Sequence, residues 1–176
     1  VLKTWPLKPG AVVRGEMAWP VAVVTTVAWL FVLIALVLSA SAFSRAGVGL
    51  RMSSGMAAII MAPAIVAAQY TVHNGAALLF PAWIATGQGR PRGVDAMGQR
   101  LIMLAGTLLV VLLALLPAAI IGGVLWFAFA RLVGPWILIP AALIGAVIVI
   151  LEVLVATESL GAAYERLDLT SVEREE

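Results

Sequence analysis

Three polar side chains, Gln69, His73 and Asn74, interrupt the second of the long apolar stretches in this sequence. Gln69 and His73 are four residues apart, so on a helix they share one face. Strongly polar groups inside a bilayer are costly and are often functional, which makes this face a candidate contact for a substrate or a proton. We favour the alternative, hydrogen bonding between helices, because His73 has no carboxylate near it in the sequence.

Glu152 is the single charged residue of the last apolar stretch and is a second candidate. A carboxylate buried there pairs with an arginine or titrates, whereas one at the rim of the membrane reaches water. Both interpretations stay open at the level of sequence.

The chemistry that these residues can support is limited. The stretch around His73 offers too few ligands for a metal ion, so we expect no metal site. The chain has no cysteine, which excludes disulfides, thiolate metal sites and cysteine nucleophiles. Nucleophile triads, Walker loops and glycine-rich phosphate loops are absent from the sequence, and we therefore expect no enzyme activity in this chain.

The elements that must position these residues are membrane helices. Of the 176 residues, 63% are hydrophobic and only 11% are charged, against about 25% charged in an ordinary soluble domain. The apolar residues form four blocks, with almost every charge between them. The sequence thus predicts an all-α, polytopic membrane helix bundle with about four transmembrane helices, several of them kinked by proline. The expected spans are residues 17–43, 55–83, 101–130 and 136–157.

Proline positions suggest where these helices bend. Pro63 and Pro117 fall inside expected spans and Pro140 in the early turns of the last one, so each is a candidate static kink or hinge. For residues 55–83 the simplest interpretation is one long kinked helix. A helix broken near His73 is the alternative, which is allowed only where protein or water shields the backbone.

The basic residues predict the orientation. With four spans, one side of the membrane collects eight of the eleven basic residues, namely Lys3, Lys8, Arg14, Arg90, Arg92, Arg100, Arg166 and Arg174. The other side holds three, namely Arg45, Arg51 and Arg131. Cytoplasmic loops carry the excess of Lys and Arg, so we expect both ends in the cytoplasm. Because the basic residues flank membrane spans, we expect the lipid bilayer and no nucleic acid as a partner.

Three stretches resemble ABC-2 type permeases, the membrane subunits of ABC exporters, and in particular the ABC exporter subgroup of that family. Residues 4–20 (TWPLKPGAVVRGEMAWP) are similar to the segment before a membrane span, with Pro6 and a Gly-Glu pair ending at Glu16. Residues 74–100 (NGAALLFPAWIATGQGRPRGVDAMGQR) carry the Phe-Pro-Ala-Trp and Met-Gly-Gln elements of that subgroup. Residues 160–170 (LGAAYERLDLT) look like its closing segment.

The resemblance implies a permease of an ABC-type exporter in the bacterial cytoplasmic membrane. It implies a partner ATP-binding subunit that hydrolyses ATP, no cofactor in this chain, and a homodimer or heterodimer of permeases. It also implies further spans before Val1, so that this chain is the C-terminal part of a longer permease. We expect residues 1–16 to be a cytoplasmic coupling segment and residues 158–176 a cytoplasmic tail. The candidate coupling residues are Trp5, Pro6, Lys8, Arg14 and Glu16.

Two alternatives stay open. The lysines of the coupling segment are equally explained as a positive flank of the first span. The whole chain could instead be a structural or accessory multispan subunit of a larger membrane complex, with its helices serving as packing surface.

Overall fold

The computed structural model describes residues 9–42, 47–79 and 94–166, and over these residues the chain is almost entirely helical. The elements are α1 (Pro9–Ala42), α2 (Val48–Leu79), α3 (Val94–Val133), the short 3-10 helix η3 (Gly134–Ile137) and α4 (Leu138–Arg166). The prediction of an all-α protein is confirmed.

Three stretches of the described chain are long and apolar enough to cross a membrane: Gly10–Ser39, Val48–Leu78 and Leu101–Ala163. The expected number of about four is not matched, because the third stretch is 63 residues long and contains α3, η3 and α4 together.

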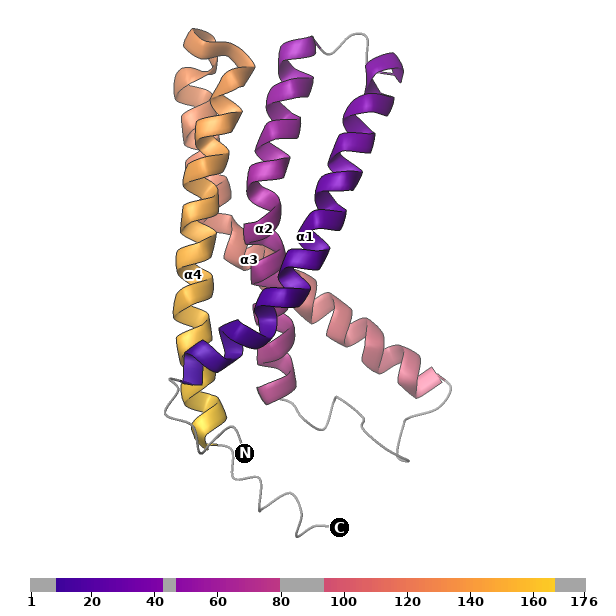
Figure 1. Ribbon diagram of the computed structural model, residues 1–176, viewed down its shortest axis with the longest axis vertical. Coiled ribbons are helices and arrows are strands. Elements are labelled where there is room, and N and C mark those ends of the chain that lie inside the picture. Colours follow the sequence, from indigo (N-terminus) through magenta and orange to yellow (C-terminus); the bar gives the residue numbers. More distant parts are fainter. Residues whose placement is uncertain (1–8, 43–46, 80–93, 167–176) are drawn as a thin grey trace.

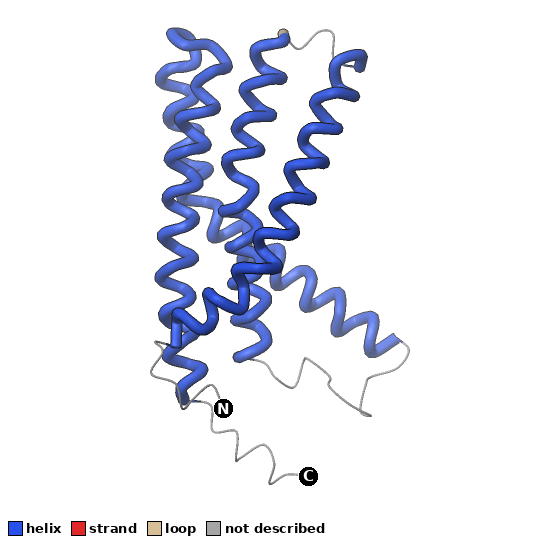
Figure 2. The backbone as a smooth tube through the Cα atoms, in the orientation of Figure 1, coloured by secondary structure: helices blue, strands red, loops and turns tan. Residues whose placement is uncertain are grey.

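The long helices run up and down between two ends of the bundle (Figures 1 and 2). The end of α1, the start of α2 and the η3 turn lie at one end, which we call the turn end. The start of α1, the end of α2, the start of α3 and the end of α4 lie at the other, which we call the terminal end. Gly134 has a φ of +67° at the reversal between α3 and α4, a backbone conformation that favours glycine.

Helix α2 is the central element. In its most apolar window 39% of the residues are buried, against 6% in α1 and 6% in the stretch that holds α3 and α4. The core consists of small side chains from three helices: Ala64 and Ala68 of α2, Ala118 of α3 and Val149 of α4. Small residues let membrane helices approach closely, which generates packing without a hydrophobic driving force between them.

The outward surface of the bundle is apolar. Large side chains such as Phe31, Leu38, Phe127 and Val155 are mostly exposed along α1, α3 and α4. A soluble monomer rarely exposes apolar patches larger than a few hundred Å². These helices therefore have both the length and the surface of membrane-spanning helices.

Prolines lie inside three of the helices, Pro20 in α1, Pro63 in α2 and Pro117 in α3. The first part of α3 points away from the bundle before the helix turns to run alongside α4 (Figure 1). A proline inside a helix removes one backbone hydrogen bond and crowds the preceding turn, which accounts for bends of this kind. Pro140 lies in the first turn of α4, where a missing N–H costs little.

The helices extend beyond the apolar blocks. Helix α1 starts at Pro9, so the second half of the expected coupling segment is continuous with the expected first span. Helix α2 runs unbroken through His73 to Leu79, in agreement with one long helix and not with a break. Helix α4 continues past residue 157 to Arg166, so the start of the expected tail is also helical. After Pro9 these flanking sequences contain no proline, and the helices continue through their glycines, so apolar content alone does not mark helix ends.

Candidate functional site

An ion pair joins the two ends of the described chain. Arg14 in α1 lies 2.7 Å, Nη1 to Oε1, from Glu158 in α4, across 144 positions of sequence. The same Nη1 donates a weaker hydrogen bond to Oγ1 of Thr157 at 3.4 Å. The first turns of α1 pass in front of α2 to reach α4 at the terminal end (Figure 1). We call residues 9–19 the α1 arm.

The arm lies closely against α4 at this point. Gly10 is buried, and a Cβ atom placed on it would lie 2.7 Å from Oε2 of Glu158. Thr157 is fully buried, and its hydroxyl donates to the carbonyl of Leu154 one turn earlier. We call Gly10, Arg14, Thr157 and Glu158 the arm cluster.

The strength of the ion pair follows from its exposure. The side chain of Arg14 is 35% exposed and that of Glu158 is 58% exposed. Water screens such a pair, so its contribution to stability is about 0.2–1 kcal/mol. The arm cluster is therefore better suited to setting the position of the arm against α4, in a contact that small forces can break, than to stabilising the fold.

The sequence singled out Arg14 of this cluster but not its partner. Glu158 looked like the first residue of a polar tail. Its charge is one signal that points to it. Arg14 lies just before the first apolar block and Glu158 just after the last, and both positions were expected on the same side of the membrane. Glu16 is exposed, and no ion pair joins it to the rest of the described chain. Trp5, Pro6 and Lys8 lie outside the described residues.

The polar residues of α2 do not converge on a site within the described chain. Gln69 and His73 are both exposed, on the face of the helix away from buried Thr71, and Asn74 is half-buried. No hydrogen bond joins the side chain of any of these three to another described residue. The shared face that the spacing predicted is present, and it points outward.

Glu152 is half-buried in the middle of α4 and has no ion-pair or hydrogen-bond partner among the residues that the structure describes. It lies one turn before Ala156, on the same face of the helix. Ala156 lines the cavity described next.

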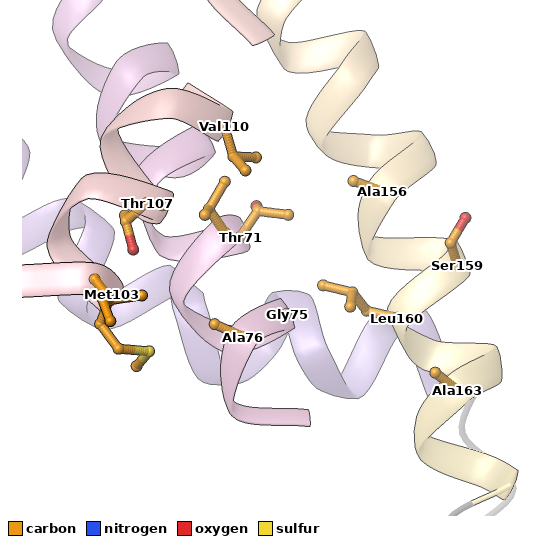
Figure 3. A pocket seen from close by; sticks show the side chains of 13 residues that line it. Thr71, Gly75, Ala76, Met103, Thr107, Val110, Ala156, Ser159, Leu160 and Ala163 are labelled. Carbon is orange, nitrogen blue, oxygen red and sulfur yellow. The ribbon is translucent and has the colours of Figure 1, made fainter. Parts of the chain in front are cut away.

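An apolar cavity of about 530 Å³ opens between α2, α4 and the outward-pointing part of α3 (Figure 3). Its walls include Thr71, Met103, Thr107 and Leu160. Leu160 reaches from α4 toward Gly75 of α2, where a Cβ atom would lie 3.3 Å from its Cδ2. The hydroxyl of Thr71 donates to the carbonyl of Ala67 in its own helix, so the cavity offers few free polar groups. It is suited to an apolar ligand or an acyl chain.

Ranges 9–42, 47–79 and 94–166 contain no group of three or more His, Cys, Asp or Glu side chains that could hold a metal ion. Comparisons with protein-family models, with curated proteins and with solved structures find no match to this chain.

Proposed function

We propose that this chain is the membrane-spanning permease part of an ABC-type exporter, which moves a substrate across the membrane with energy from a separate ATPase subunit. Its support is the resemblance of residues 4–20, 74–100 and 160–170 to ABC-2 type permeases, together with the arm cluster. The arm cluster is the observation that carries the proposal, because it links the expected coupling segment to a helix of the bundle.

The proposal includes four membrane crossings. As one continuous helix the stretch Leu101–Ala163 would be about 95 Å long, whereas the hydrocarbon core is about 30 Å thick. The left-handed conformation of Gly134 supports a reversal within this stretch, and thus two crossings. With four crossings, eight of the eleven basic residues of the sequence would lie on one side of the membrane, and the excess of Lys and Arg in cytoplasmic loops favours a cytoplasmic terminal end.

In this proposal the ATPase acts on the cytoplasmic end of the arm. Because α1 is one helix from Pro9 to Ala42, a displacement of the arm moves the first span. The bond from Arg14 to Glu158 holds the arm against α4 in one position, and a displacement of the arm breaks it. The resulting motion is a rigid-body rocking of spans around the small-residue core, with no covalent chemistry in this chain.

A structural or accessory subunit of a larger membrane complex is the second candidate. The observation that favours it is the outward face formed by Gln69 and His73. Polar side chains that face lipid are costly, and a packing partner would cover them. A second permease in a homodimer or heterodimer would cover the same face. The face therefore distinguishes an exporter from an accessory subunit only when the protein that packs against it has been identified.

The test is purification of the full-length protein from its native membrane in mild detergent. The exporter proposal predicts that a Walker-motif ATPase copurifies, and that deletion of residues 1–14 abolishes this association. Arg131→Gln, at the turn end, is the matched control and should leave the association unchanged. Absence of any ATPase would contradict the exporter, whereas an ATPase that survives the deletion would contradict only the coupling role of the arm.

A further inference from the structure

A second cavity, of about 390 Å³, lies between α1 and α2 at the turn end, where the two helices diverge (Figure 1). Most of its wall is apolar and includes Val32, Leu36 and Ala58. Its one charged lining residue is Arg51, in the first turn of α2, and Ser39 and Ser54 add two hydroxyl groups. The cavity is thus amphipathic, with a guanidinium set into apolar walls.

Arg51 is half-buried, and not all of its hydrogen-bond donors have a partner among the described residues. Its Nε atom is buried and donates to no acceptor among the described residues. A buried donor without a partner costs about 1–3 kcal/mol. Because Nε is buried, a ligand in the cavity would remove that cost only by drawing the side chain of Arg51 toward itself.

The two hydroxyl groups of the cavity do not supply free donors. Ser39 donates to the carbonyl of Leu36, and Ser54 donates to the carbonyl of Arg51. Among the side chains that line the cavity, the guanidinium of Arg51 is therefore the group that can donate hydrogen bonds to a ligand. A cationic donor with no competing donor beside it selects for an anionic acceptor.

The part of the chain that the structure describes offers no carboxylate for Arg51 at this end. The sequence has no Asp or Glu from residue 17 to residue 94, and none from residue 96 to residue 151. Residues 45, 51 and 131, all arginines, therefore belong to a part of the chain without a counter-charge. Arg51 differs from Arg131 in being half-buried and in lining a cavity, whereas Arg131 is exposed.

We propose that this cavity binds a phospholipid of the adjacent leaflet, with the lipid phosphate on the guanidinium of Arg51 and the start of an acyl chain against the apolar wall. Arginine suits this role because its planar guanidinium binds phosphate through two parallel hydrogen bonds. A position in the first turn of a spanning helix is also the depth at which lipid phosphates lie. The apolar wall favours a lipid over free phosphate, which has no apolar part to bury.

Native mass spectrometry of the full chain in mild detergent tests this proposal, with phosphatidylglycerol, diacylglycerol and inorganic phosphate as probes. We expect one bound phosphatidylglycerol, no bound diacylglycerol, and no displacement by inorganic phosphate. Arg51→Gln should weaken phosphatidylglycerol binding about ten-fold or more, because a hydrogen bond to a charged group is lost. Arg51→Lys should retain part of the binding, and Arg131→Gln should retain all of it.

Equal binding of diacylglycerol would overturn the proposal, because the phosphate would then play no part. Displacement by inorganic phosphate would also overturn it in favour of a free-anion site. Unchanged lipid binding in Arg51→Gln would also overturn the proposal, because the lipid phosphate would then not lie on Arg51. If Arg51→Gln fails to fold, the comparison of probes on the unmodified chain and on Arg51→Lys still decides the question.

Discussion

The indole N–H of Trp29 in α1 donates a hydrogen bond of 2.9 Å to the backbone carbonyl of Ile59 in α2. That carbonyl lies four residues before Pro63, which has no N–H to donate to it. Trp29 therefore satisfies the backbone acceptor that the proline leaves free. In a membrane helix, where water does not reach the backbone, such compensation from a neighbouring helix is what makes an internal proline tolerable.

This relationship predicts a non-additive pair of substitutions. Trp29→Phe keeps most of the ring but removes the donor, and should lower the free energy of unfolding by about 0.6–1.7 kcal/mol through loss of the hydrogen bond. In a Pro63→Ala background the helix supplies its own donor to Ile59, so the same change should cost clearly less. Unfolding in mixed detergent micelles measures both costs, and equal costs in the two backgrounds would contradict the compensation.

The arm cluster predicts a rescue by charge exchange. Arg14→Glu alone and Glu158→Arg alone each place like charges together and should release the arm from α4, whereas the double exchange should restore the contact. Because the chain has no native cysteine, the contact can be read by cross-linking two introduced cysteines, one in the arm next to Gly10 and one in α4 next to Glu158. A double exchange that cross-links no better than the single variants would show that the ion pair does not position the arm.

Two glycines of the arm provide a matched comparison. At Gly10 a methyl group would meet the carboxylate of Glu158, whereas at Gly15 nothing lies within 4 Å of it. Gly15→Ala should stabilise the protein by up to about 1 kcal/mol, the helix-propensity difference between the two residues. Gly10→Ala should gain less, because Glu158 must move away from Arg14. Equal gains in unfolding experiments would argue against the close approach of the arm.

The small-residue core gives a second matched pair. Gly145 of α4 is the point where three helices meet, with Met61 Sδ 3.3 Å and Ala118 Cβ 3.5 Å from the position of a methyl group. Gly145→Leu should destabilise the bundle by about 1–3 kcal/mol through overpacking. Gly122→Leu, in α3 with nothing within 4 Å, should be tolerated. Similar losses of stability for the two variants would contradict the helix arrangement.

The apolar blocks of the sequence predicted the helical class and the approximate positions of the helices. They did not predict the helix ends, because an apolar block marks the part of a helix suited to hydrocarbon. A flanking segment with only a few charged residues, such as Arg14 and Glu16, and no proline after Pro9 continues the helix. The start of α1 at Pro9 is consistent with the preference of proline for the first turn of a helix.

The candidate site was only partly accessible from the sequence. Spacing showed that Gln69 and His73 share a face, but not that this face points outward. The direction depends on which side of α2 carries the small residues that pack against α4, as Gly75 does against Leu160. The partners of Arg14 and Trp29 depend on how α1 lies against two other helices, and a pattern within a single helix contains no such information.

The topology of the bundle is tested most directly by labelling single cysteines with a membrane-impermeant maleimide, in intact cells and in inverted membrane vesicles. Exposed positions are available at both ends: Gly47 directly before α2 and Leu132 at the end of α3 belong to the turn end, and Met97 in the first turn of α3 and Ser159 in the last turns of α4 belong to the terminal end. Four crossings with a cytoplasmic terminal end predict that cysteines at Gly47 and Leu132 react in intact cells, and those at Met97 and Ser159 only in inverted vesicles. A cysteine at Leu132 that reacts from the same side as one at Ser159 would contradict the fourth crossing.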